Sequence, residues 1–329
     1  MKEPQSSPPK AAGDSPLRSL LARREMIVLL LLLLIAVTLQ VASNGLFLQS
    51  RNLSVMADRK APEALVTIGI TFLLIANQFD LSVASVMAFS GATTAWMLVN
   101  GFPMVVSILG GLAAGVLIGC LNGFLVTRLQ IPSFITTLGT MYIARSGAQV
   151  ITHGRPIGGL PEDFIALGKI QVFGLPWYFI LLVVCVLVLT FLLKKQKSLY
   201  KIFFVGNNAK AASMVGIRNM RITLNLFMVS AFIAAIAGII LTSKSYSASP
   251  IAFERMEMRY IAACVIGGAS ISGGQGSIIG SILGFLLIVL IGNGMTLIGI
   301  SPYWENVIFG SILAIAAIAD AYSTGRRRE

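Results

Sequence analysis

The chain has 329 residues, of which 56% are hydrophobic and only 12% are charged, and its formal net charge is +12. Soluble domains average about 25% charged residues, so this composition excludes an ordinary soluble fold and indicates an integral membrane protein. The positive residues lie in loops and tails that flank apolar runs, which favours a role in membrane orientation over nucleic-acid binding.

The apolar segments are long unbroken runs, not the alternating strands of a membrane barrel, so we expect an all-α fold. Residues 1–17 are rich in Pro, Ser, Lys and Ala, and we expect a disordered cytoplasmic tail before a membrane domain at 18–322. The first apolar run, 26–41, follows Arg23 and Arg24. A signal peptide is the alternative interpretation, but the leader is long and no small-residue cleavage site ends the run, so we interpret it as an uncleaved span.

Nine further apolar runs can cross a bilayer if tilt and broken helices are allowed. They are 61–76, 81–99, 103–126, 134–151, 175–193, 222–242, 260–271, 277–300 and 303–319. About ten transmembrane helices place both termini on one side. With the N-terminus inside, 16 Lys and Arg residues face the cytoplasm and 7 face the other side, so the sequence predicts that both termini are cytoplasmic, with a basic tail at 323–329.

Some spans are interrupted by polar residues or glycine. The run that ends at Asn77-Gln78-Phe79-Asp80 is followed at once by the next run, which predicts a broken pair of helices. Glycines also punctuate 110–123 in the first half and 267–284 in the second half. This weak echo is typical of transporters built from two repeats, but glycine-rich helices that only pack together give the same pattern.

A basic hydrophilic segment, 194–221, holds 7 of the 25 Lys and Arg residues and no acidic residue. Such a segment cannot lie in hydrocarbon, and its charge predicts a cytoplasmic loop. Its centre predicts a short helix that begins at Asn207 or Asn208 and ends at Gly216. We interpret this helix as one displayed to a separate motor protein. The alternative is an amphipathic turn that rests on anionic membrane lipid.

Asp80 is the one good candidate for a charged group deep in the spans. The other ionisable residues in or beside the runs lie mostly near their ends; they are Arg145, Glu257, Arg259, Glu305 and Asp320. We interpret Asp80 as a helix cap whose carboxylate accepts backbone N–H bonds. The alternative is a titrating carboxylate of an ion-coupled carrier.

Neutral polar side chains in the spans predict the lining of a translocation pathway for an uncharged, hydroxyl-rich solute. The candidates, with Asp80, are Ser82, Ser85, Asn122, Thr136, Thr137 and Asn293. For any single Ser or Thr, the alternative is a hydroxyl that bonds a carbonyl of its own helix.

The sequence lacks the common catalytic and cofactor motifs. It has no G-x-x-x-x-G-K-[ST] phosphate loop and no HExxH, CxxC or GxSxG motif. Cys120, Cys185 and Cys264 fall singly inside apolar runs, and His153 is the one histidine. We therefore expect no catalytic residues, no metal site, no cofactor and no enzymatic activity in this chain.

Several motifs, taken together and in order, resemble the permease subunits of bacterial ABC importers for monosaccharides, which include ribose, xylose, galactose, arabinose and autoinducer-2 systems. The resemblance runs from about residue 26 to residue 322. Its motifs are FDLSVAS at 79–85 with Gly91, NG at 122–123, IPSFITTLGTM at 131–141, GNN at 206–208 with Ala211, Ala212, Gly216 and Ile217, GGAS at 267–270, GGQGS at 273–277 with Gly280, and GNGM at 292–295.

This resemblance implies a homodimeric, multi-pass permease of the bacterial inner membrane that works by alternating access with a cytoplasmic ATPase and a periplasmic sugar-binding protein. ATP would be hydrolysed by the partner. The resemblance also implies that the basic segment couples the permease to the ATPase, through Gly206, Asn207, Asn208, Ala211, Ala212 and Gly216.

Where many relatives have Gly-Ile-Asp-Leu-Ser-Val-Gly-Ser, this chain has QFDLSVAS at 78–85, a form similar to arabinose-type permeases, which favours a pentose. The alternative function is a stand-alone, ion-coupled secondary transporter of a small polar solute. A membrane scaffold without transport is disfavoured by the polar residues repeated through the spans.

Overall fold

The computed structural model describes residues 24–301, 303–304, 307–308, 310–311 and 314, and most of these residues are helical. The all-α fold is therefore confirmed for the described part of the chain. The predicted tails at 1–17 and 323–329, most of the run 303–319, and the residues Glu305 and Asp320 lie outside the described residues.

The helices follow the apolar runs closely. The long helices are α2 (Arg24–Ala42), α3 (Ser50–Ile75), α4 (Val83–Val99), α5 (Met104–Arg128), α6 (Ser133–Ile151), α8 (Trp177–Lys195), α11 (Asn219–Lys244) and α13 (Ile278–Leu297). The shorter elements are α7 (Glu162–Leu167), β1 (Gln171–Val172), β2 (Leu175–Pro176), α9 (Lys197–Asn207), α10 (Ala209–Met214) and α12 (Met256–Ile266). Among the described residues, five helices, α2, α5, α8, α11 and α13, are long and apolar enough to cross a membrane.

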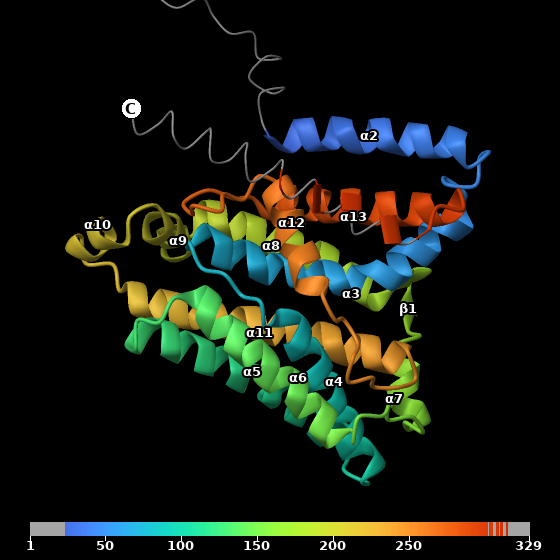
Figure 1. Ribbon diagram of the computed structural model, residues 1–329, viewed down its shortest axis with the longest axis horizontal. Coiled ribbons are helices and arrows are strands. Elements are labelled where there is room, and N and C mark those ends of the chain that lie inside the picture. The colour runs from blue at the N-terminus through green and yellow to red at the C-terminus, as the bar shows by residue number, and fades with distance from the viewer. Residues whose placement is uncertain (1–23, 302, 305–306, 309, 312–313, 315–329) are drawn as a thin grey trace, which may run out of the picture.

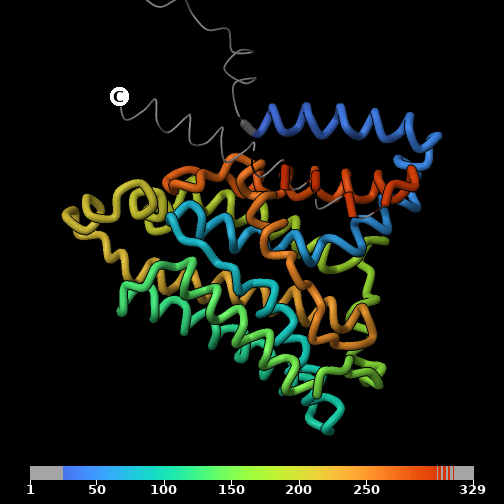
Figure 2. The backbone as a smooth tube through the Cα atoms, viewed as in Figure 1, coloured from blue at the N-terminus to red at the C-terminus, as the bar shows by residue number. Residues whose placement is uncertain are grey.

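The helices form two layers, as Figure 1 shows: α2, α3, α8, α12 and α13 in one, and α4, α5, α6 and α11 in the other. Helix α11 joins the layers because it packs against α3 as well as against α4 and α5. The tube in Figure 2 shows α9 and α10 at one end of the molecule, with α7 and the strands at the opposite end. We call these the α10 end and the hairpin end, since β1 and β2 pair as an antiparallel hairpin.

Glycines allow the helices of the second layer to approach closely. A Cβ atom added at Gly238 of α11 would lie 2.1 Å from the carbonyl oxygen of Met87 on α4. One added at Gly119 of α5 would lie 2.6 Å from the carbonyl oxygen of Phe227 on α11. Helices in lipid associate by such backbone approach, because lipid tails give no hydrophobic force between them.

Helix α3 begins earlier than the second apolar run predicted. It starts at Ser50, and its first half carries Asp58, Arg59, Lys60 and Glu63. Glu63 is only 7% exposed, so it is a buried carboxylate that our sequence-based set of ionisable residues omitted. The charges ended the apolar run in the sequence, but a helix can carry them when they pair, and Lys60 Nζ lies 2.7 Å from Glu63 Oε1.

The helical structure is interrupted or short at two places in the predicted spans. Residues 76–82 separate α3 from α4 without forming a helix, and most of them are buried. Helix α12 has 11 residues, which gives a length of about 16 Å, roughly half of the hydrocarbon thickness. Non-helical backbone of this kind is tolerated in a membrane where protein groups satisfy its hydrogen bonds.

Candidate functional site

The basic segment folds into α9 and α10 at the α10 end. Asn208 is the N-cap of α10, and its Oδ1 accepts a hydrogen bond from the backbone N–H of Ala211 at 2.9 Å. Gly216, with φ +81°, follows the helix in the left-handed conformation that glycine adopts readily. The predicted short helix is confirmed, with Asn208 as its cap, while Asn207 is the last residue of α9.

Helix α10 presents an apolar tip to the outside. Met214 is 88% exposed and Val215 is 77% exposed, whereas Ala212 is buried. The side chain of Asn219, at the start of α11, donates a hydrogen bond to the carbonyl oxygen of Ala209 at 2.6 Å. The tip is therefore held in place by α11 while its two large apolar side chains contact little of this chain.

Gly206 joins the basic segment to the rest of the molecule. A Cβ atom added at this buried glycine would lie 1.7 Å from the carbonyl oxygen of Ile75, the last residue of α3. The same carbonyl accepts a hydrogen bond from the N–H of Gly274 at 2.8 Å. Gly273, with φ +81°, lies beside them, since its added Cβ would be 2.7 Å from the carbonyl oxygen of Gly206. Three motif glycines thus meet where α9, α3 and the loop before α13 converge.

A buried polar network holds the break between α3 and α4. Asp80 Oδ1 accepts hydrogen bonds from the backbone N–H of Ser82 at 2.8 Å and from its hydroxyl at 2.6 Å. Asn122 Nδ2 of α5 donates to Ser82 Oγ at 2.9 Å, and Thr140 Oγ1 of α6 donates to Asn122 Oδ1 at 2.6 Å. One chain of hydrogen bonds therefore links the break to two neighbouring helices.

Helix α6 also satisfies the backbone of the break. Thr137 Oγ1 accepts a hydrogen bond from the N–H of Leu81 at 3.1 Å, and Ser133 Oγ accepts one from the N–H of Phe79 at 3.1 Å. Thr137 Oγ1 also donates to the carbonyl of Ser133 in its own helix at 2.8 Å, the alternative considered for such residues. These bonds replace the donors and acceptors that a continuous helix would supply.

Asp80 is not the N-cap of α4. The N-cap residue is Ser82, and it makes no side-chain cap bond. The carboxylate of Asp80 instead binds the N–H two residues ahead, which forms an Asx turn before the helix begins. The prediction that the Asp80 carboxylate accepts a backbone N–H is confirmed, but the prediction that Asp80 caps the helix is wrong.

The structure brings some of the predicted pathway residues together. Six of them are buried, with exposed fractions of 0–5%: Asp80, Ser82, Ser85, Asn122, Thr136 and Thr137. Four of the six, all except Ser85 and Thr136, belong to the bonds described above. Asn293 lies apart, on α13 in the other layer, where it exchanges two amide hydrogen bonds with Asn52 of α3 at 2.9 and 3.0 Å.

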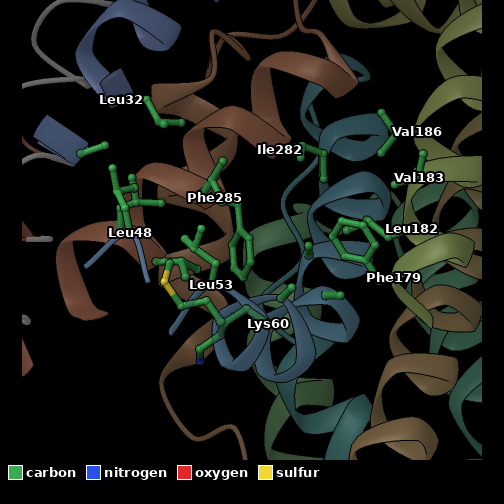
Figure 3. A pocket seen from close by; sticks show the side chains of 18 of the residues that line it. Leu32, Leu48, Leu53, Lys60, Phe179, Leu182, Val183, Val186, Ile282 and Phe285 are labelled. Carbon is green, nitrogen blue, oxygen red and sulfur yellow. The ribbon is translucent and has the colours of Figure 1, made fainter. Parts of the chain in front are cut away.

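Two of the cavities beside the first half of α3 have contrasting linings. A cleft of about 500 Å³ between α2, α3, α8 and α13 is lined by aliphatic and Phe side chains, with Lys60 at its edge (Figure 3). It suits hydrocarbon and not a hydrophilic solute, because its walls offer almost no hydrogen-bonding groups. A second cavity of about 760 Å³, between α3, α8 and α11 at the hairpin end, is lined by charged and hydroxyl groups that include Asp58, Tyr178 and Lys244.

The sequence did not reveal this polar cavity. Asp58 lies between the first two apolar runs, and Tyr178 and Lys244 stand at the edges of apolar runs. The signal that could have revealed the cavity was the group of charged residues just before the second apolar run, which belongs to the first half of α3. Within the described ranges, no group of three or more His, Cys, Asp or Glu side chains could hold a metal ion.

Helices that are long and apolar enough to cross a membrane lie in both layers. A displayed helix lies at one end, and polar groups are buried between the helices. These features are typical of a polytopic transport protein. A family model described as "Branched-chain amino acid transport system / permease component" matches residues 52–317. The chain belongs to this family of permeases. It is therefore a multi-pass protein of the bacterial inner membrane and a transport subunit, not an enzyme.

Named relatives show the same class. The chain is 36% identical to the ribose import permease of Bacillus subtilis (strain 168) over 84% of this chain and 87% of the relative. It is 37% identical to the L-arabinose transport system permease of Escherichia coli (strain K12) over 80% of each. It is 33% identical to the autoinducer 2 import system permease of Photorhabdus laumondii over 78% and 77%. The resemblance to permeases of monosaccharide ABC importers is confirmed. No solved structure matches the chain.

We predict that Asn122→Ala destabilises the protein by about 1–3 kcal/mol, because it removes a partner from the buried Ser82 and Thr140 side chains. The thermal unfolding midpoint of the purified protein in detergent measures this. Asn100→Ala is the control, since the exposed Asn100 amide bonds only the Trp96 carbonyl of its own helix, and its effect is expected to stay within about 0.5 kcal/mol. Equal midpoints for the two variants would contradict the network.

Proposed function

We propose that the chain is the permease subunit of an ATP-driven importer that moves a neutral monosaccharide across the inner membrane by alternating access. The observation that carries this proposal is the junction at Gly206, where the segment expected to meet an ATPase touches the end of α3. Relatives named for ribose, L-arabinose and autoinducer 2 support the cargo class. The form of residues 78–85 favours a pentose.

The proposed topology has ten spans, with both tails and the α10 end in the cytoplasm and the hairpin end in the periplasm. The tails are 1–17 and 323–329, on either side of a membrane domain at 18–322. The alternating helix directions support this arrangement. Helix α3 ends at the Gly206 junction, α13 begins beside it, and α2 begins near α13 because Ser277 donates a hydrogen bond to Glu25. The basic charge of 194–221 favours the cytoplasmic side.

Helix α3 is the proposed mechanical link. Its last residue, Ile75, touches Gly206 and binds Gly274, and Asp58 in its first half lines the polar cavity. These two residues stand about 25 Å apart along one helix, at 1.5 Å per residue. When ATP binding and hydrolysis in the partner move α9 and α10, α3 carries that movement to the hairpin end.

The same movement would reorganise the buried polar residues. Residues 76–82 begin directly after Ile75, so a shift of α3 pulls on the hydrogen bonds of Asp80 and Ser82 with Asn122. We assign these groups, with Ser85, Thr136, Thr137 and Asn293, to the translocation pathway, where they become accessible to the solute in other states of the cycle.

The partners in this proposal are a cytoplasmic ATPase, a periplasmic sugar-binding protein and a second copy of the permease. Each chain has a single coupling segment, with Gly206, Asn207, Asn208, Ala211, Ala212 and Gly216 as its residues. An ATPase with two sites needs two such segments, and each chain supplies one, which favours a symmetric homodimer.

We predict ATP-dependent uptake of L-arabinose, D-ribose or D-xylose by vesicles that hold the permease with its ATPase and binding protein. Pentoses are expected to be taken up faster than D-glucose, and L-leucine is included because the family description names branched-chain amino acids. Radiolabelled uptake with and without ATP is the measurement. Equal sugar uptake without ATP, or uptake of L-leucine alone, would reject the proposal.

We predict that the double substitution Met214→Ser, Val215→Ser weakens binding of the ATPase by about tenfold or more, because exposed apolar side chains at a contact centre carry much of the binding energy. Both side chains are largely exposed, so the thermal stability of the permease is expected to be unchanged. Co-purification of the ATPase in detergent measures the effect. Ile251→Ser is the matched control, an apolar residue 62% exposed at the opposite end. Undiminished co-purification of the double variant would show that the tip is not the docking surface.

We predict that Gly206→Ala keeps ATPase binding but abolishes most uptake. Its methyl group would overlap the Ile75 carbonyl, so α9 must move away from α3 while α10 keeps its surface. Co-purification and ATP-driven uptake are compared in the same preparation. Gly158→Ala is the control, because nothing lies within 4 Å of a Cβ atom at that exposed loop position. Normal uptake by Gly206→Ala would show that the junction does not transmit movement.

A further inference from the structure

The polar cavity at the hairpin end has the dimensions of a small-molecule site. Its volume is about 760 Å³, inside the range of roughly 300–1,000 Å³ typical of ligand pockets. Residues of α3, α8, α11, the hairpin region and the loop after α11 line it. It therefore lies where the two helix layers meet, at the end away from α10 (Figure 1).

A proline in α3 frees a backbone carbonyl group beside the cavity. Pro62 lies inside α3 and has no N–H, so the carbonyl oxygen of Asp58, four residues earlier, loses its helical donor. Lys244 Nζ, at the end of α11, donates to that oxygen at 2.5 Å and forms an ion pair with the Asp58 carboxylate. Tyr178 OH, from α8, donates to the same carboxylate and accepts from Lys244 Nζ at 2.8 Å. Asp58, Tyr178 and Lys244 thus bind three helices together at the cavity.

Three of the other four charged groups of the wall are also engaged. Lys60 pairs with Glu63 at 2.7 Å, and Lys169 Nζ lies 5.0 Å above the ring of Tyr246. Tyr246 itself is 49% exposed and lines the cavity. The wall therefore offers hydrogen-bond donors and acceptors in ion pairs, next to an accessible aromatic ring.

We propose that this cavity is the outer holding site for a neutral monosaccharide on the transport path, an inference that rests on the function proposed above. Sugar hydroxyls both donate and accept hydrogen bonds, so they match a wall in which carboxylates accept and ammonium groups donate. The C–H face of the sugar ring packs on Tyr246, as apolar surface packs on aromatic rings. Asp58 also connects the site to α3, so sugar in the cavity contacts the helix whose other end meets Gly206.

Cysteine protection tests the site in the full-length chain, reconstituted in lipid nanodiscs without its partners. Ser245 is exposed and lines the cavity, so Ser245→Cys is labelled with a charged methanethiosulfonate reagent in the presence of L-arabinose, D-ribose, D-xylose, D-glucose or D-gluconate. A bound sugar is expected to slow labelling about twofold at the concentration that half-fills the site. Glu162→Cys, exposed on α7 at the same end, is expected to react equally with and without sugar. The wild-type chain measures the background from Cys120, Cys185 and Cys264.

A second substitution assigns the protection to the cavity. Tyr246 has φ +57°, a conformation that Asn tolerates better than most residues. Tyr246→Asn in the Ser245→Cys chain is expected to raise the half-protecting sugar concentration about tenfold, or ~1.4 kcal/mol. Unchanged protection in this variant would overturn the role of Tyr246 and of the cavity.

Three further outcomes also decide the proposal. Absence of protection by every sugar, together with normal ATP-driven uptake, would overturn the holding site and leave the proposed function standing. Protection by D-gluconate alone would overturn the proposal that the ligand is a neutral sugar. The wall carries more positive than negative side chains, including Arg59 and Lys169, and these could bind the gluconate carboxylate. Absence of ATP-driven uptake in the wild-type complex would overturn the proposed function itself.

Discussion

Backbone polar groups that leave a helix inside a membrane must find partners in the protein, and this constraint explains where the buried polar contacts of this permease lie. The carbonyl freed by Pro62 binds Lys244. The N–H groups of Phe79 and Leu81 bind side chains of α6, and Gly274 binds the last carbonyl of α3. Each interruption of helical structure therefore recruits a polar or glycine residue from another element. Lys244 links the two helix layers in this way, and Gly274 links the loop before α13 to α3 within one layer.

Helix α3 contains or adjoins all three of these interruptions. It contains Pro62, it ends at Ile75 beside Gly206, and the buried break at 76–82 follows it directly. It packs against α8, α12 and α13 within its own layer and against α11 of the other layer, so it lies where the two layers meet. A single stiff helix in this position connects the α10 end with the polar cavity. In the proposed mechanism this helix carries displacement along its axis from one end to the other, so no chain of small side-chain movements is needed.

Much of the architecture followed from local features of the sequence. Apolar runs marked nine helices, and the helix ends lie within a few residues of the run ends except at the start of α3, because a membrane helix must be continuously apolar over its lipid-exposed length. Asn208 and Gly216 marked the ends of the short helix α10, because capping depends on neighbouring residues only. The motifs also identified the permease family. The seven predicted pathway residues were chosen because they are polar residues within or beside apolar runs. Six of them are buried, but the sequence did not show which residues they bind.

The sequence by itself determined the membrane class, the helix positions and the displayed helix, since these depend on composition and on contacts between near neighbours. Only the tertiary structure decided how distant residues meet. It joined Gly206, Gly273 and Ile75 at one junction, linked Asp80 to Asn122, and placed Asn293 in a different layer. It also extended α3 through charged residues that ended the apolar run. Charges inside a membrane helix are tolerated where partners from other helices neutralise them, and such pairing between α3 and α11 cannot be derived from neighbours along the chain.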